Sequence, residues 1–183
     1  QTLSIDRLTP VIGAELHGID LRGPITDEVY EAVHDALLEH QVVFLRDQDI
    51  TPEQQIAFAH RFGEIHHHPY MAGMDDYPDI LEIIKEPGDS YTFGASWHTD
   101  QQFNPEPAKA TMLYAKETPS AGGDTMYANM YDAYDALSDG MKDMLKGVRT
   151  WCVGDRDKLS RGRSTRDERY AGNKAMAAQV KDP

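Results

Sequence analysis

The N-terminal third of the chain shows the clearest pattern of apolar and polar positions. Residues 4–8 alternate apolar and polar side chains, as a half-buried strand does, and residues 11–16 predict a second short strand. Thr26 followed by two acidic residues predicts the start of a helix. A threonine side chain caps the free backbone N–H groups at a helix start, and the helix dipole stabilises acidic side chains in the first turn. The helix is predicted to end near His40. Four apolar residues at helical spacing give this helix one buried face: Val29, Val33, Ala36 and Leu37.

A third strand and a second helix follow directly. Residues 41–46 are a compact apolar, partly β-branched run that predicts a buried strand. Thr51, Pro52 and Gln54 then open another helix, with Thr51 as its N-cap, Pro52 at its first position and Gln54 completing a capping box. The buried residues predicted for this helix are Ile56, Ala59 and Phe62.

Beyond residue 63 the pattern becomes shorter and more irregular. Residues 80–84 and 110–115 are strand candidates, separated by stretches rich in Gly, Pro, Asp and Ser. Residues 130–137 and 138–145 predict two short helices, the second capped by Ser138. Helices early in the chain and short strands from the middle onward predict an α+β fold. A chain of 183 residues has room for one domain with a substantial core, so a single domain is expected over residues 1–183.

Composition excludes some partners and adds little about the substrate. The net charge of −13 argues against a nucleic-acid or anionic membrane surface, since both select basic patches. No apolar run is long enough to span a bilayer, and the first residues lack a signal pattern, so a cytoplasmic enzyme is expected. The one cysteine, Cys152, lies in an apolar trio and is predicted to be a packed strand residue. Residues 160–183 are polar and predict a loop.

The strongest chemical signal is the succession Trp97, His98, Thr99, Asp100. Residues two apart in a strand point to the same face, so His98 and Asp100 can direct an imidazole and a carboxylate at one point. Coordination of Fe(II) by two histidines and one carboxylate needs such a pair and one more histidine, and leaves three positions open. Taken alone, the tripeptide favours a structural role, because hydrogen bonding in protein cores often produces the same pattern.

Several further motifs accompany this pair. They are QVVFLRDQ at residues 41–48, TP at 51–52, RFGE at 61–64, HHHP at 66–69 and GGDT at 122–125. With these motifs, in this order and at matching spacings, the chain resembles the taurine/2,4-dichlorophenoxyacetate dioxygenase family of 2-oxoglutarate enzymes. The resemblance runs from about Ile5 to the last residues, and it rests on separate motifs that agree.

The resemblance implies a fold, a cofactor and a set of site residues. The implied fold is a double-stranded β-helix, or jelly roll, with flanking helices. The implied cofactors are Fe(II) and 2-oxoglutarate as cosubstrate. By position, His98 and Asp100 look like iron ligands, and Thr125 looks like the hydroxyl that holds the distal carboxylate of 2-oxoglutarate. His68 and Gln101 look like residues that contact or border the substrate.

Two further parts of the family's active site have no counterpart in this sequence. All eight histidines lie at or before residue 98. The family takes its third iron ligand from a later strand, together with an arginine that pairs with the 2-oxoglutarate carboxylate. We therefore expect a domain that is incomplete at its C-terminus, without the last strands of the jelly roll, and inactive as residues 1–183 alone.

The resemblance also limits the reaction and its partners. Family members act on sulfonates, sulfate esters and aryloxyalkanoates, with release of succinate and CO2, so a small anionic substrate is expected beside O2. Gly94 stands where taurine-cleaving members carry asparagine, which argues against taurine itself. A homo-oligomer is expected, without nucleic acid or membrane.

Other interpretations of the same residues stay open. A cupin-like barrel that is non-catalytic or holds another metal shares the strands without needing iron. A zinc hydrolase built on the histidine tract is less favoured, because no helical motif with a catalytic glutamate accompanies it. His66 and His67 are predicted to be solvated or structural. Tyr70 and Met71 either line the substrate pocket or pack in the core.

Overall fold

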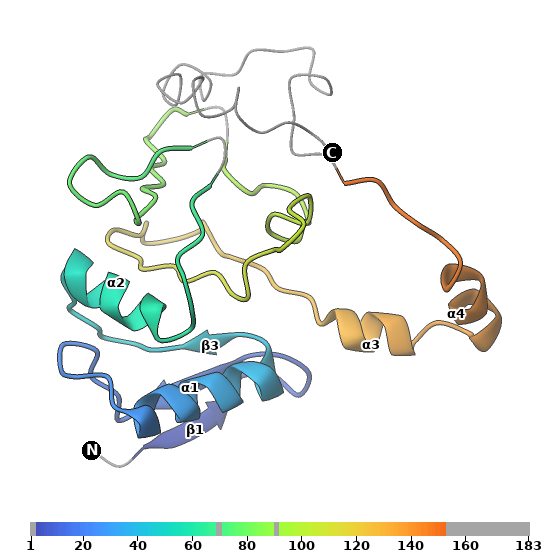
Figure 1. The fold of residues 1–183 in the computed structure, drawn as a ribbon, viewed down its shortest axis with the longest axis horizontal. Helices are drawn as coiled ribbons and strands as arrows, with labels where there is room; N and C mark the ends of the chain where they lie inside the picture. The colour runs from blue at the N-terminus through green and yellow to red at the C-terminus, as the bar shows by residue number, and fades with distance from the viewer. Residues whose placement is uncertain (1–2, 69–70, 90–91, 153–183) are drawn as a thin grey trace. The chain divides into compact units, whose positions relative to one another are not determined.

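The computed structural model describes residues 3–68, 71–89 and 92–152. The described residues fall into two compact units, one formed by parts of Gln1–Arg61 and Leu113–Arg149, the other by parts of Phe62–Met112 and Thr150–Pro183. All the helices and strands of the described residues lie in the first unit (Figure 1). In chain order they are β1 (Ser4–Arg7), β2 (Ala14–His17), α1 (Asp27–His40), β3 (Val43–Phe44), α2 (Pro52–His60), α3 (Met130–Asp135) and α4 (Asp139–Leu145).

The three strands form one small sheet in the order β1-β2-β3. β1 pairs antiparallel with β2, from Ser4 opposite His17 to Arg7 opposite Ala14. β2 pairs parallel with β3, and α1 is the crossover that a parallel pair requires. The strand predicted at residues 4–8 is confirmed, but its predicted half-burial is wrong. All four residues of β1 are exposed, because β1 is an edge strand of this sheet.

Helix α1 has the bounds that its sequence predicts. The Thr26 hydroxyl accepts a hydrogen bond from the Val29 N–H, which satisfies one of the free donors at the helix start. Val33 and Ala36 are buried, as the apolar spacing indicates, and His40 is buried with them. The helix ends at Gln41, which adopts a left-handed conformation with φ of 60°.

Helix α2 also begins as predicted but buries a different residue. The capping box between Thr51 and Gln54 is present in both directions. Phe58 is the buried residue of the helix, whereas Ile56 and Ala59 are only half-buried, so the predicted stripe is wrong. A phenylalanine ring removes more apolar area from water than either of the predicted residues, so its burial decides which face of a short helix turns inward.

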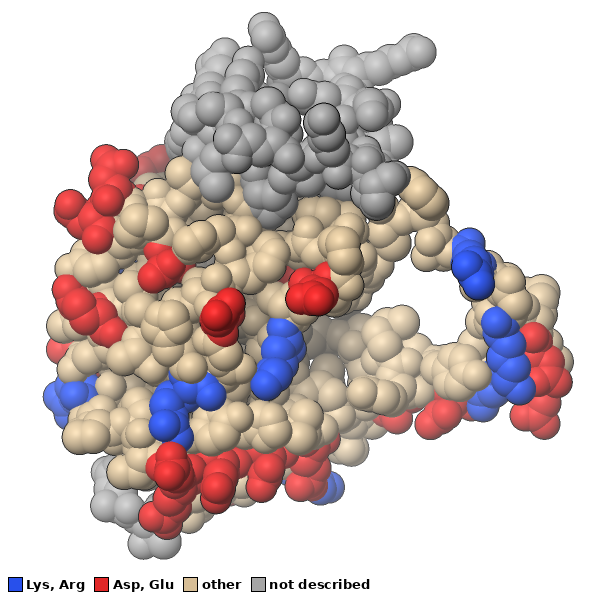
Figure 2. All heavy atoms as spheres, in the orientation of Figure 1, with Lys and Arg blue, Asp and Glu red and all other residues tan. Residues whose placement is uncertain are grey.

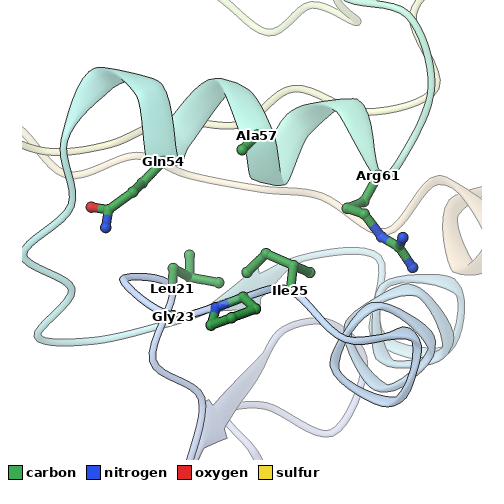
Figure 3. Close-up of a pocket in the computed structure, with 7 residues that line it drawn as sticks. Leu21, Gly23, Ile25, Gln54, Ala57 and Arg61 are labelled. Atoms are coloured by element: carbon green, nitrogen blue, oxygen red, sulfur yellow. The ribbon is translucent and has the colours of Figure 1, made fainter.

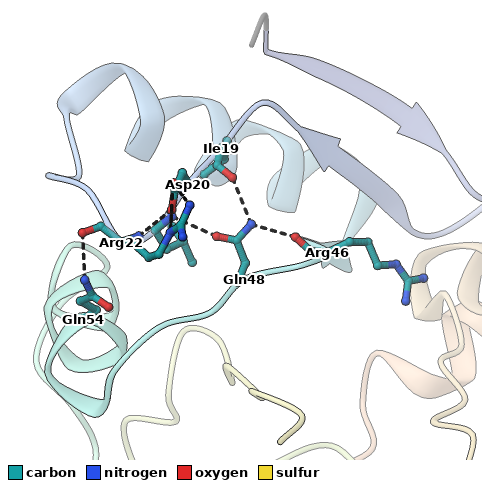
Figure 4. A network of polar contacts seen from close by, with 7 residues as sticks. Ile19, Asp20, Arg22, Arg46, Gln48 and Gln54 are labelled. Atoms are coloured by element: carbon teal, nitrogen blue, oxygen red, sulfur yellow. Dashed lines mark hydrogen bonds and ion pairs between the residues drawn. The ribbon is translucent and has the colours of Figure 1, made fainter.

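The loop that precedes α2 is fixed by the side chain of Gln48 (Figure 4). Its amide oxygen accepts the Leu21 N–H at 2.9 Å, and its amide nitrogen donates to the carbonyls of Ile19 and Arg46 at 3.0 and 2.8 Å. The Tyr114 hydroxyl donates to the Gln48 carbonyl at 2.8 Å. Gln48 therefore joins three stretches of the first unit that are far apart in sequence.

The strands expected after residue 63 are absent from the described part of the chain. Residues 80–84 and 110–115 are irregular, and β3 covers only two of the residues predicted at 41–46. A ladder needs a partner strand, and the backbone around Ile80 is used in turns instead: Met74 N–H donates to the Ile80 carbonyl and Ile80 N–H to the Tyr77 carbonyl. The described residues thus form an α+β arrangement with one small sheet.

The two short helices predicted near the end of the described residues are present. Helices α3 and α4 match the two predicted short helices, with Asn129 and Ser138 as their N-caps. No helix in the described residues has the length and apolar character needed to cross a membrane. The predicted loop at residues 160–183 lies outside the described residues.

Candidate metal centre

The side chains of His98 and Asp100 face each other in the second unit. The His98 Nε2 lies 3.1 Å from the Asp100 Oδ1. The closeness that the sequence predicts is confirmed, but the predicted strand is wrong, because residues 97–99 are irregular and Asp100 begins a turn. Gln101, with φ of 49°, turns the chain immediately after Asp100. The imidazole and the carboxylate therefore meet on irregular backbone that leads into a turn.

Further contacts hold both side chains in this orientation. The Ser96 carbonyl lies 2.7 Å from the His98 Nδ1, the nitrogen that points away from Asp100. The Thr111 hydroxyl donates to the Asp100 Oδ2 at 2.7 Å, which leaves Oδ1 as the oxygen that faces His98. Gly94 has φ of 70°, and a Cβ there would lie 3.5 Å from the His98 Cε1. Contacts of this kind orient the ligands in metal sites.

The donor atoms of this pair are compatible with a cation. Each ring nitrogen of His98 faces an oxygen: Nδ1 faces a carbonyl and Nε2 faces a carboxylate. Nε2 and Oδ1 lie at hydrogen-bond distance from each other, and an ion that bound both atoms would lie to one side of the line that joins them. A neutral imidazole and a carboxylate are ligands that Fe(II) accepts. The two side chains are about half exposed, which leaves room for further ligands.

A third ligand does not join them within the residues that the structure describes. His, Cys, Asp and Glu side chains form no group of three there that could hold a metal ion.

The histidine tract makes polar contacts within the second unit. The Asn104 amide nitrogen lies 2.7 Å from the Gln101 Oε1 and 3.1 Å from the His66 Nε2. The His67 Nε2 lies 2.7 Å from the Asp79 Oδ1. His66 and His67 thus have the structural contacts that one of the sequence interpretations expects. The same Asn104 amide ties the predicted substrate residue Gln101 to its own turn.

The other predicted site residues lie in different surroundings. His68 is half-buried in the second unit, and its carbonyl accepts the N–H of Met71 at 3.4 Å. Met71 is buried, which favours packing for this residue, and Tyr70 lies outside the described residues. Thr125 belongs to the first unit, is exposed and lies on irregular backbone. The roles of His68, Gln101 and Thr125 stay predictions.

Cys152 corrects a further expectation. The sequence predicts a packed strand residue, but the side chain is exposed on irregular backbone. Its thiol lies 3.7 Å from the Gln102 Oε1. The neighbouring Trp151 is also exposed, so the apolar character of this segment is not matched by burial.

A pocket of about 270 Å³ lies in the first unit, between α2 and the loop that precedes α1 (Figure 3). It is lined by Leu21, Gly23, Pro24, Ile25, Gln54, Ala57 and Arg61. Its polar lining residues are already engaged: Arg61 pairs with Asp27, and the Gln54 amide donates to the Arg22 carbonyl. None of the predicted site residues lines this pocket.

The charge around the candidate pair is acidic. Residues 62–112 contain nine Asp and Glu side chains and two lysines. Acidic side chains also outnumber basic ones on the face shown in Figure 2. Acidic surroundings favour a bound cation, whereas an anionic substrate would need positive charge from the metal or from side chains outside this segment.

Comparison with known proteins identifies the family. The model of the family described as "Taurine catabolism dioxygenase TauD, TfdA family" matches residues 4–178. The chain belongs to this family. Among curated TauD/TfdA relatives, an alkylsulfatase of Acinetobacter baylyi is 36% identical over 143 residues, which are 78% of this chain and 44% of the relative. An alpha-ketoglutarate-dependent sulfate ester dioxygenase of Pseudomonas putida is 33% identical over 143 residues, 78% of this chain and 46% of the relative.

Solved structures agree with this assignment. A taurine dioxygenase from Burkholderia xenovorans is 30% identical, with a TM-score of 0.65, and the match covers 80% of this chain and 52% of that one. The enzyme AAD-2, solved in complex with Mn(II) and N-oxalylglycine, is 30% identical, with a TM-score of 0.59 over 80% of this chain and 51% of that one. The TauD/TfdA chain described here spans about half the length of the relatives it matches.

Proposed function

We propose that the protein to which this chain belongs is an Fe(II)- and 2-oxoglutarate-dependent dioxygenase of small anionic substrates. The observation that carries the proposal is the His98–Asp100 pair, with Nε2 and Oδ1 at 3.1 Å, in a chain of the TauD/TfdA family. One imidazole nitrogen and one carboxylate oxygen this close together supply two of the three ligands that a two-histidine, one-carboxylate iron site needs.

Each predicted residue has one task in this proposal. His98 and Asp100 hold the iron through Nε2 and Oδ1, while Ser96 and Thr111 keep these atoms in place. Thr125 donates a hydrogen bond to the distal carboxylate of 2-oxoglutarate. With 2-oxoglutarate and O2, the iron supplies the oxidising chemistry that modifies the substrate and releases succinate and CO2.

The substrate side is assigned to His68 and Gln101. Gln101 follows Asp100 directly, and Asn104 holds its amide oxygen, so its amide group keeps a fixed orientation beside the pair. His68 is half-buried, and an imidazole in such a position can donate a hydrogen bond to an anion.

A sulfate ester, sulfonate or aryloxyalkanoate is the substrate class that we propose. Relatives bear the names alkylsulfatase, sulfate ester dioxygenase and (S)-phenoxypropionate/alpha-ketoglutarate-dioxygenase, the last 33% identical over 147 residues. These compounds share an anionic group on a small organic skeleton. Gly94, which has no side chain to offer to a substrate, makes taurine a poor candidate.

The jelly roll, the third histidine and the arginine complete the proposal. The likeness to solved TauD/TfdA-family structures supports a double-stranded β-helix for the whole protein. The distribution of histidines supports a third ligand contributed from outside residues 1–183.

The first prediction tests the iron ligands in the full-length protein. His98→Ala and Asp100→Ala should each reduce O2-dependent succinate formation from 2-oxoglutarate at least a hundredfold, because removing one ligand of three leaves the metal loosely held. The thermal unfolding midpoint of the metal-free protein should change little, because both side chains are about half exposed. His60→Ala, which removes an exposed histidine at the end of α2, is the control.

Two results would contradict the proposal. Wild-type-like turnover by either variant would remove that residue from the site. Metal binding by the wild-type protein without succinate formation, across substrates of the three classes, would favour a non-catalytic or other-metal cupin-like barrel instead.

A further inference from the structure

Thr111 makes a contact with the candidate metal pair that no sequence motif indicates. It follows Asp100 by eleven residues, and its hydroxyl donates to the Asp100 Oδ2 at 2.7 Å. The other carboxylate oxygen, Oδ1, faces the His98 Nε2 at 3.1 Å. The two oxygens of one carboxylate therefore have different partners.

The hydrogen bond from Thr111 limits how Asp100 can coordinate a metal ion. A carboxylate whose second oxygen is held by a hydroxyl offers a metal ion one oxygen, whereas a free carboxylate can rotate and offer both. A one-oxygen contact from Asp100 leaves one more coordination position open. An iron centre that must accept a bidentate keto acid and O2 needs three open positions beside its three protein ligands.

The hydrogen bond also fixes the direction of the carboxylate. Asp100 is about half exposed, so packing alone does not select its rotamer. Ser96 performs the matching task for the imidazole through its carbonyl. Thr111 and Ser96 thus orient the carboxylate and the imidazole from opposite ends of the pair.

We propose that Thr111 is a positioning residue that holds Asp100 as a one-oxygen ligand and thereby sets the affinity and coordination of the metal. The inference rests on the proposed function, because it needs a metal at His98 and Asp100. Thr111 acts through Asp100 and does not itself contact the metal, the cosubstrate or the substrate.

The test is a titration of the metal-free full-length protein with Co(II), followed by its d–d absorption. Thr111→Val keeps the shape of the side chain and removes the hydroxyl, and it should weaken Co(II) binding about tenfold, as loss of an outer contact to a metal ligand does. The absorption spectrum should also change, because Asp100 can then bind through both oxygens.

Thr111→Ser, which keeps the hydroxyl, should retain both the affinity and the spectrum of the wild-type protein. Thr118→Val makes the same chemical change at an exposed threonine elsewhere and is the control.

The outcomes separate this inference from the proposed function. If the wild-type protein does not bind Co(II), or if His98→Ala binds it equally well, the metal site itself is wrong and Thr111 has no such role. If the wild-type protein binds Co(II) and His98→Ala does not, but Thr111→Val retains wild-type affinity and spectrum, only the role of Thr111 is overturned. If Thr111→Val does not fold, Thr111→Ala and Thr111→Ser decide the same question, since serine keeps the hydroxyl and alanine lacks it.

Discussion

Asp20 and Arg22 form an exposed contact whose pH dependence has a definite sign (Figure 4). The Arg22 guanidinium donates to the Asp20 carboxylate and lowers the pKa of Asp20 from 3.8 to about 2. Because the pKa in the folded protein lies below the ordinary value, the contact favours the folded state fully above about pH 4. This contribution disappears as the pH falls through about 2.

The second prediction concerns this pKa. Arg22→Gln should raise the pKa of Asp20 toward 3.8 without reaching it, because the backbone N–H of residue 22 still donates to the carboxylate. The measurement is an NMR titration of the Asp20 carboxyl carbon in both proteins. An unchanged midpoint would show that the guanidinium is not in contact with Asp20 in solution.

At the candidate site, the sequence predicts which two side chains meet, but it does not predict the backbone conformation or the contacts that hold them. The spacing of His98 and Asp100 indicates that their side chains can converge, and they do. The strand geometry that motivates this expectation is wrong, because residues 97–99 are irregular and Asp100 begins a turn. Thr111 and Ser96 were not predicted at all. Single hydroxyl and carbonyl contacts of this kind depend on the path of a loop, and a loop leaves no periodic pattern in the sequence.

The elements of the first unit show which signals in the sequence are strong. Thr26, Thr51 and Ser138 were predicted as N-caps, and each accepts a backbone N–H in the structure. Capping is local, because the donor lies within three residues of the cap, so a short stretch of sequence contains the whole interaction. The buried residue Phe58 was missed, because burial depends on what the helix packs against.

The hydrogen bonds by which Gln48 connects distant segments of the first unit have no signal in the sequence. Its side chain joins the loop after β2 to the segment after β3, over separations of 27 and 29 residues. The third prediction is that Gln48→Met lowers the free energy of unfolding by about 1–3 kcal/mol, because the part-buried N–H of Leu21 loses its acceptor. Chemical denaturation of the full-length protein measures this difference.

Gln55→Met on α2 is the matched control for that prediction. It makes the same chemical change at a half-buried glutamine whose side chain has no hydrogen bond to any other described residue. Its unfolding midpoint should stay close to wild type. Equal destabilisation by the two variants would show that loss of the Gln48 hydrogen bonds is not the cause.

At the scale of the whole molecule, strand pairing limits what the sequence predicts. Residues 80–84 and 110–115 have the composition of strands, yet neither forms a ladder in the described part of the chain. A strand exists only with a partner, and partners can lie anywhere in a polypeptide, so composition alone does not establish the sheet. The family was predictable for the opposite reason. Its motifs are short and ordered along the chain, and they need no knowledge of pairing.

The last prediction concerns the cosubstrate, whose affinity is a property of the complete enzyme. Thr125→Val removes one hydroxyl that we propose donates to the distal carboxylate of 2-oxoglutarate. A hydrogen bond to a charged group contributes about 1.5–3 kcal/mol, so the KM for 2-oxoglutarate should rise roughly ten- to a hundredfold. Thr125 is not one of the proposed metal ligands, so Co(II) affinity measured without 2-oxoglutarate should stay at the wild-type value. Steady-state kinetics in which 2-oxoglutarate and the primary substrate are each varied with the other saturating, with Thr125→Ser as the variant that keeps the hydroxyl, measure the effect. A rise confined to the KM of the primary substrate would assign Thr125 to the substrate side of the site instead, because a hydroxyl that binds only the cosubstrate leaves that constant unchanged.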